Sequence, residues 1–144
     1  MKEKTVDIKI VIGQDPQIVF RALTDPEIVK LWWRSPDFYE VMQFQMEPYK
    51  GGRWKMNALG YDGKPFDVSG EVLEFDPPRT LAFTWNPTFQ DIDTTTVRIT
   101  LSSTSEGVLL RLVHSGFKHD RLGFESHYYG WPHVLNWLAN HLQS

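Results

Sequence analysis

Apolar and polar side chains alternate through most of the stretch from Phe38 to His114. A period of two residues is typical of strands that bury one face and expose the other. Short turn signals separate the alternating segments, most clearly Gly51-Gly52, Asp62-Gly63 and Glu106-Gly107. Strands that follow one another through such short turns pair with antiparallel neighbours. The pattern therefore predicts a meander of about six strands.

The two ends of the chain add one strand and three helices to this prediction. Alternation over residues 5–12 indicates a strand before the meander. Pro16 and Pro26 each follow an aspartate, which is the arrangement expected where a helix begins, so we predict two short helices before Ser35-Pro36. From Phe124 to Leu142 the apolar period changes to three and four residues, which predicts one long helix with a bend at the internal proline.

These elements favour a layered arrangement in one domain over residues 1–144. A long helix lying across a large, curved antiparallel sheet would cover one face of the sheet. The chain has no repeat, linker or low-complexity tract that would mark a second domain. A gap between a sheet and a helix, rimmed by loops, is also a place where small-molecule sites occur.

The composition argues against several classes of function. Lys and Arg number 15 against 18 Asp and Glu, so the net charge of −3 lacks the basic footprint of a nucleic-acid or anionic-lipid binder. The absence of cysteine excludes disulfides, thiolate metal sites and cysteine nucleophiles. The N-terminal residues lack the apolar core and the cleavage site of a secretory signal, and no apolar run is long enough to cross a bilayer. We therefore expect a cytoplasmic protein without membrane insertion.

A series of motifs runs in order along nearly the whole chain. The motifs are Val19-Phe20-Arg21-Ala22-Leu23-Thr24-Asp25-Pro26, Leu31-Trp32-Trp33, Gly51-Gly52-Arg53-Trp54, Gly70-Glu71-Val72, Asp76-Pro77-Pro78-Arg79-Thr80-Leu81, Phe83-Thr84-Trp85, His114-Ser115-Gly116-Phe117 and Gly130-Trp131. In this order they resemble the activator of heat-shock protein 90 ATPase homologue family (C-terminal domain-like), within the START-like or SRPBCC superfamily. The resemblance implies an α+β helix-grip fold, in which about seven antiparallel strands wrap around the C-terminal helix. Related members include lipid-transfer domains, polyketide cyclases and the birch-pollen allergen class, so the resemblance implies no single activity.

Aromatic residues are abundant, with six Trp, nine Phe and five Tyr making up 14% of the chain. The strand and helix periods turn many of these rings, and several Met side chains, toward the space between sheet and helix. Such side chains suit contact with an apolar ligand, but rings of this size could also simply fill the core. The residues that we predict to line a ligand pocket are Trp33, Phe44, Met46, Trp54, Met56, Phe83, Trp85, His114, Phe117, Tyr128, Trp131 and Leu135.

His114 shares its strand face with Leu110 and Leu112 and is therefore expected to point inward. It could bind a ligand, transfer a proton, or be a core histidine with satisfied hydrogen bonds. The remaining histidines lack the spacing of a helical metal motif, and the chain has neither a nucleophile elbow nor a phosphate loop. We predict no catalytic residue, no metal and no cofactor.

Three functions fit these features. The leading hypothesis is binding of a small apolar or aromatic molecule between the sheet and the C-terminal helix. The second is a protein-interaction module of the co-chaperone kind that uses Trp32-Trp33 together with Trp137. Trp32-Trp33 is the most exposed-looking aromatic pair, of which one ring could pack under the helices while the other gates the pocket or forms a partner surface. The third is a cyclase- or hydrolase-type enzyme in which His114 and Tyr128 move protons. A homodimer through a free sheet edge is open in each case.

Overall fold

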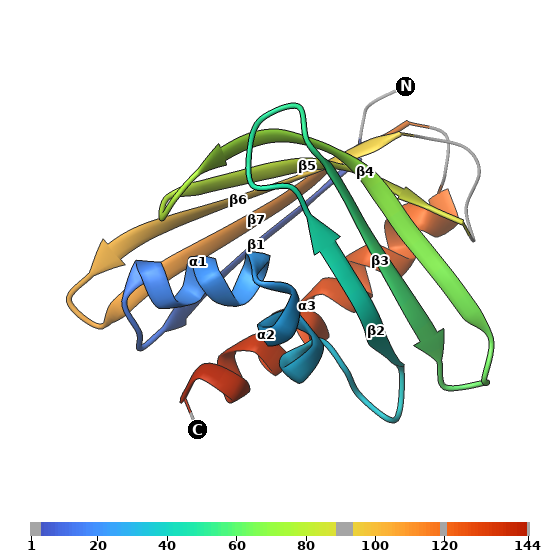
Figure 1. Ribbon diagram of the computed structural model, residues 1–144, viewed down its shortest axis with the longest axis horizontal. Helices are drawn as coiled ribbons and strands as arrows, with labels where there is room; N and C mark the ends of the chain where they lie inside the picture. Colours follow the sequence, from blue (N-terminus) through green and yellow to red (C-terminus); the bar gives the residue numbers. More distant parts are fainter. Residues whose placement is uncertain (1–3, 89–93, 119–120, 144) are drawn as a thin grey trace.

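The computed structural model describes residues 4–88, 94–118 and 121–143, and within them it contains the predicted elements in the predicted order (Figure 1). The first strand and the two short helices are β1 (Lys4–Ile12), α1 (Pro16–Thr24) and α2 (Pro26–Trp32). The meander and the last helix are β2 (Tyr39–Met46), β3 (Arg53–Gly60), β4 (Pro65–Asp76), β5 (Thr80–Pro87), β6 (Thr95–Thr104), β7 (Gly107–Phe117) and α3 (Arg121–Gln143).

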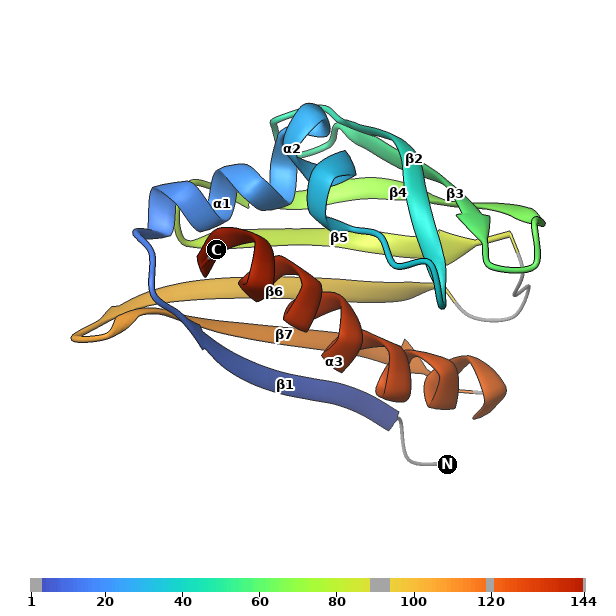
Figure 2. The ribbon, with the colours of Figure 1, turned by 90° about the horizontal axis from the view of Figure 1, so that it is seen from below.

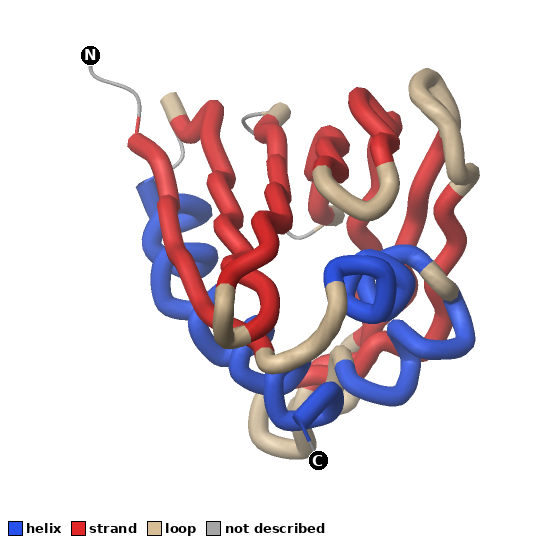
Figure 3. Tube along the Cα trace, turned by 90° about the vertical axis from the view of Figure 1, so that its left-hand side faces the viewer, coloured by secondary structure: helices blue, strands red, loops and turns tan. Residues whose placement is uncertain are grey.

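All the strands pair antiparallel in one sheet of order β1-β7-β6-β5-β4-β3-β2. Strands β2 to β7 follow one another as the predicted meander, and β1 pairs with β7 at the far edge. The sheet curves, and the helices lie on one side of it (Figure 3). Helix α3 crosses the concave face (Figure 2). The helix-grip fold of the α+β class is therefore confirmed.

Two of the predicted turns depend on glycine conformations. Gly63, between β3 and β4, has φ +80°, and Gly107, between β6 and β7, has φ +129°. Side-chain-bearing residues rarely adopt such angles, so glycine allows the chain to reverse within a few residues. In the β3–β4 hairpin, Oδ1 of Asp62 also accepts the backbone N–H of Lys64 at 3.0 Å. This hairpin faces α3 across a pocket.

The two short helices begin differently, although both were predicted to start with an aspartate cap. Asp25 caps α2, because its Oδ1 accepts the N–H of Glu27 at 2.9 Å. Asp15 occupies the corresponding position of α1, but its side chain makes no capping hydrogen bond. The prediction of a side-chain cap is therefore correct for α2 and wrong for α1.

Helix α3 buries one stripe of side chains against the sheet. The buried members of this stripe are His127, Trp131, Val134, Leu135 and Leu138. The helix continues through Pro132, which lies on the exposed side of the helix. Among the described residues, no helix combines the length and the apolar character that a membrane span requires.

Candidate ligand-binding pocket

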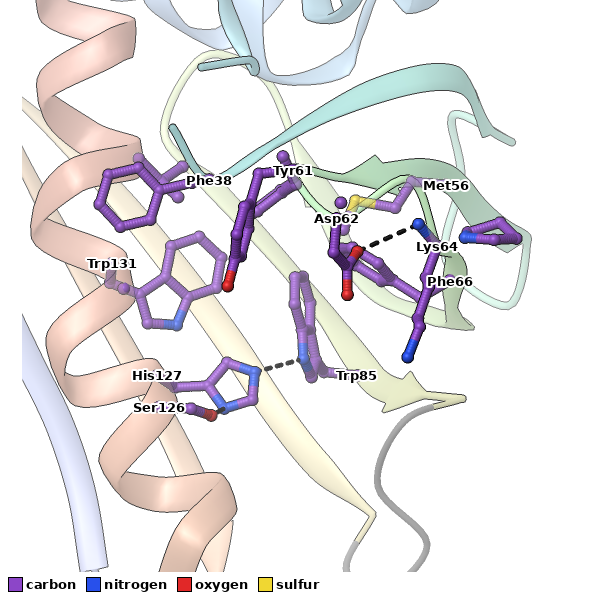
Figure 4. A pocket seen from close by; sticks show the side chains of 15 residues that line it. Phe38, Met56, Tyr61, Asp62, Lys64, Phe66, Trp85, Ser126, His127 and Trp131 are labelled. Atoms are coloured by element: carbon purple, nitrogen blue, oxygen red, sulfur yellow. Dashed lines mark hydrogen bonds between the residues drawn. The ribbon is translucent and has the colours of Figure 1, made fainter. Parts of the chain in front are cut away.

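A pocket of about 500 Å³ lies between α3 and the β3–β4 hairpin (Figure 4). This volume is within the usual range for small-molecule sites. From α3, the pocket is lined by His127, Gly130, Trp131 and Val134. From the sheet and its loops, it is lined mainly by Phe38, Tyr39, Met56, Tyr61, Phe66 and Trp85. Aromatic rings therefore form a large part of the wall, and among the described residues charged side chains (Asp62 and Lys64) enter it only from the hairpin.

Trp85 and His127 meet at one side of the pocket (Figure 4). The indole N–H of Trp85 donates to Nε2 of His127 at 2.9 Å. Nδ1 of His127 lies 2.6 Å from the carbonyl oxygen of Gly123, one helical turn earlier. Because a carbonyl can only accept, this arrangement fits a neutral imidazole with its proton on Nδ1. Both ring nitrogens of His127 are thus engaged within the protein.

A second indole–imidazole pair lies behind the first. Trp131 donates its indole N–H to Nδ1 of His114 at 2.9 Å, and both side chains are buried. Nε2 of His114 is 2.7 Å from Oγ1 of Thr95, which in turn donates to the carbonyl oxygen of Trp85 at 3.1 Å. The chain of bonds is complete if the imidazole is neutral and carries its proton on Nε2.

The surroundings of His114 strongly favour the neutral form. Burial lowers the pKa of His114 to about 2, and the neighbouring imidazole of His127 adds to the effect. The two rings lie 4.8 Å apart between centroids. His114 is therefore a core histidine with satisfied hydrogen bonds, as one of the sequence-based alternatives held.

Only part of the predicted pocket faces open space. Of the twelve predicted residues, Met56, Trp85 and Trp131 line the pocket of about 500 Å³. Another group surrounds a second cavity of only about 20 Å³, which is roughly the size of one water molecule. This second group consists of Trp33, Phe44, Met46, Trp54, Phe83 and Leu135. For these residues the filled-core alternative describes the structure better.

The last three predicted residues lie outside both groups. His114 and Phe117 are buried behind the pocket, with their ring centroids 4.5 Å apart. Tyr128 is 52% exposed and contacts the rings of Phe124 and Tyr129 rather than the pocket. The sequence stripe that placed Tyr128 inward is wrong by one residue, because the face of α3 that meets the sheet runs through His127.

The structure also changes the expectation for three tryptophans. Both Trp32 and Trp33 are buried, so neither ring of the pair forms a partner surface, and their indole N–H groups donate to the carbonyl of Ala22 and the hydroxyl of Tyr39. Trp137 is half-buried and its ring lies near Phe38 and Tyr39, at centroid distances of 5.9 and 5.8 Å. These side chains therefore do not form the exposed aromatic surface that the interaction hypothesis used.

Sequence reasoning missed most of the open side of the pocket. Phe38, Tyr39, Tyr61 and Phe66 come from the start of β2 and from the β3–β4 hairpin. The hairpin signal at Asp62-Gly63 was present in the sequence, but nothing in it indicates that this hairpin and α3 line the same pocket. Within the described part of the chain, no three His, Asp or Glu side chains gather as a metal site would require.

The comparison with protein families identifies the chain. The model of the family described as "Activator of Hsp90 ATPase homolog 1-like protein" matches residues 15–143. The chain belongs to this family. The predicted family and its START-like superfamily are therefore confirmed, and the match includes both of the short helices, the meander and α3.

Solved structures give the same fold. A protein from Chromobacterium violaceum is 27% identical, with a TM-score of 0.83 over 97% of this chain and 98% of that one. A protein from Mesorhizobium loti is 30% identical, with a TM-score of 0.78 over 97% of each chain. The family-related protein from Aeromonas hydrophila is 18% identical (TM-score 0.80, covering 97% of this chain and 92% of that one) and supports the fold alone. The comparison with curated proteins gave no match.

Proposed function

We propose that this protein binds a small apolar or aromatic molecule in the pocket between α3 and the β3–β4 hairpin. The observation that supports this proposal is an open pocket of about 500 Å³ whose wall consists largely of aromatic rings. Binding there would remove apolar surface of both partners from water, which is the main source of affinity in such sites. The indole N–H groups of Trp85 and Trp131 already donate to imidazoles, so a ligand would not need to satisfy them.

The enzyme alternative has less support. His114 engages both ring nitrogens within the protein and has a pKa near 2, so it is a poor proton donor or acceptor at neutral pH. Tyr128, the other candidate, is turned away from the pocket. The co-chaperone alternative is compatible with the family, but its proposed contacts at Trp32 and Trp33 are buried. A single domain, a cytoplasmic location and a homodimer stay predictions.

A pocket-filling substitution at Gly130 tests the proposal. Gly130 lines the pocket, and a Cβ atom added there would meet no atom within 4 Å. Gly130→Leu would therefore fill pocket volume without displacing neighbouring atoms at its first carbon. Asn140→Leu is the matched control, because Asn140 is an exposed residue of the same helix and does not line the pocket.

The probe is N-phenyl-1-naphthylamine, a neutral dye whose fluorescence rises in apolar sites. We expect the wild type and Asn140→Leu to bind it with equal affinity. Gly130→Leu should bind it more weakly by about tenfold or more, because leucine occupies the space that the dye needs. No binding by the wild type, or equal binding by all three proteins, would contradict the proposal. Circular dichroism would verify that each variant is folded.

A further inference from the structure

We infer that the hydroxyl of Tyr39 is the hydrogen-bond donor that the pocket offers to its ligand. The ligand class would then be an uncharged, flat apolar molecule with an acceptor oxygen at its buried end, such as an aryl ketone. This inference rests on the proposed function and adds to it the polar group that would orient the ligand. It follows from which N–H and O–H groups of the pocket wall already donate to an acceptor within the protein and which do not.

Tyr39 is held firmly at the wall of the pocket. It is the first residue of β2, and its ring packs edge-on against Phe66 and Trp137 at centroid distances of 5.3 and 5.8 Å. Its hydroxyl oxygen accepts the indole N–H of Trp33 at 3.0 Å. The ring and the oxygen are thus both fixed before any ligand arrives, which reduces the entropy that binding would cost.

The proton of this hydroxyl is not used within the described part of the chain. A tyrosine hydroxyl can accept hydrogen bonds and donate one. The side chain of Tyr39 accepts a hydrogen bond from the indole N–H of Trp33. Its own O–H has no acceptor among the described residues. By contrast, the indole N–H groups of Trp85 and Trp131 donate to His127 and His114.

The hydroxyl also lies deep in the site. Trp33, which donates to the hydroxyl, has its ring stacked near Trp85 at a centroid distance of 6.4 Å and tilted against Trp131 at 6.0 Å. Both Trp85 and Trp131 line the pocket. Burial raises the pKa of Tyr39 to about 12, so the proton is retained throughout the physiological range. A ligand that reaches the inner aromatic wall would therefore meet a permanent O–H donor.

The same surroundings favour a neutral acceptor over an anion or a donor group. Among the described residues that line the pocket, the one with a positive charge is Lys64 of the hairpin. The negatively charged Asp62 lines the pocket from the same hairpin. A carboxylate beside Tyr39 would lose its hydration and gain one neutral hydrogen bond, which is an unfavourable exchange. A ligand N–H at this depth would find the Nε2 acceptor of His127 already taken by Trp85, and the oxygen of Tyr39 already accepting from Trp33. A ketone oxygen avoids both difficulties.

Two naphthalenes of matched shape test this inference. 2-Acetylnaphthalene carries a ketone, and 2-isopropylnaphthalene replaces its oxygen with a methyl group. Each would compete with N-phenyl-1-naphthylamine for the wild type, Tyr39→Phe and Tyr129→Phe. Tyr129 is a matched control, because it is an exposed tyrosine of α3 that does not line the pocket.

The measured quantity is the ratio of the two dissociation constants for each protein. Within one variant, a general loss of packing affects both ligands and cancels in the ratio. The Trp33 N–H that Tyr39→Phe frees can donate to the ketone alone, so the double variant Trp33→Phe, Tyr39→Phe is compared with Trp33→Phe in the same way. We expect Tyr39→Phe to shift the ratio against the ketone by about three- to tenfold relative to the wild type, the usual size of one neutral hydrogen bond. Tyr129→Phe should leave the ratio unchanged.

The outcomes separate this inference from the function on which it rests. If the hydrocarbon binds but Tyr39→Phe leaves the ratio unchanged, the role of Tyr39 is refuted while ligand binding stands. If the wild type binds neither naphthalene nor the dye, both are refuted. If Tyr39→Phe does not fold, infrared spectroscopy of the wild type decides: the carbonyl band of bound 2-acetylnaphthalene should lie below its frequency in hexane, and an unshifted band overturns the inference.

Discussion

The indole N–H of Trp131 in α3 donates to Nδ1 of His114 in β7 across 2.9 Å. Since Nδ1 accepts, a neutral ring must carry its proton on Nε2, where it faces Oγ1 of Thr95 at 2.7 Å. A second proton on the ring would direct an N–H of His114 at the N–H of Trp131. The helix–sheet contact therefore requires an uncharged histidine, in agreement with its low pKa.

This requirement predicts that the fold loses stability in mild acid. The pKa of His114 is about 2 in the folded protein against an ordinary 6.5. Between these values the unfolded chain binds more protons, so the free energy of unfolding falls as the pH falls, by at most about 1.4 kcal/mol per pH unit from this group. Above about pH 7 this contribution is constant. Urea denaturation between about pH 7.5 and pH 4.5 would measure the slope.

His114→Asn separates this group from the other titrating residues. An asparagine amide oxygen can still accept the N–H of Trp131, but the side chain does not titrate. We expect the variant to be less stable at neutral pH, because the hydrogen bond between the imidazole and Thr95 is lost, and to show a shallower slope in acid. The two proteins differ only at residue 114, so an identical slope would mean that His114 does not carry the acid sensitivity.

The sheet could be predicted from the sequence because its signals are local. Alternation with a period of two and turns such as Asp62-Gly63 and Glu106-Gly107 act within a few residues, and each one appears in the structure. The long helix was likewise predictable, since its apolar stripe repeats over several turns. The family motifs extended these local signals to the whole fold.

The pocket was only partly predictable, because its wall depends on contacts between distant segments. Inward orientation on a strand does not distinguish Met56, which meets open space, from Trp54, which lies in the filled core. On α3, His127 and Tyr128 differ by one position, and a polar histidine was a weaker candidate for burial than an aromatic ring. The structure pairs this histidine with Trp85, a contact across 42 positions that no local pattern indicates.

Trp54→Ala should test the filled part of the core. Trp54 is 2% exposed, packs on Phe83 at a centroid distance of 4.8 Å and donates its N–H to the carbonyl of Thr84. We expect the substitution to lower the free energy of unfolding by roughly 3–5 kcal/mol, as for other large-to-small changes in cores. Urea denaturation measures the loss, with the exposed Leu31→Ala in α2 as control. A similar, small effect of both changes would mean that Trp54 is not tightly packed.

Two glycines should respond oppositely to substitution by alanine. Gly130 lies inside α3 with open space at its Cβ position, so Gly130→Ala should raise stability by up to about 1 kcal/mol through helix propensity and a less flexible unfolded chain. Gly70 lies in β4, where a Cβ atom would collide with the carbonyl oxygen of Thr84. Gly70→Ala should therefore destabilise the protein. Thermal denaturation of both variants checks the two signs, and a stabilised Gly70→Ala would show that the strands can separate at little cost.

Tyr61 allows ligand contact to be separated from stability. It lines the pocket but is 78% exposed, so Tyr61→Ala should change the free energy of unfolding by less than about 0.5 kcal/mol. Loss of its ring against a flat ligand should weaken binding of N-phenyl-1-naphthylamine by about two- to tenfold, the range expected for an aromatic contact. Tyr49→Ala is the control, because Tyr49 is also exposed and lies outside this pocket. If both variants bind the dye as tightly as the wild type, the ligand lies deeper than the hairpin and contacts only the wall formed by Trp85 and Trp131.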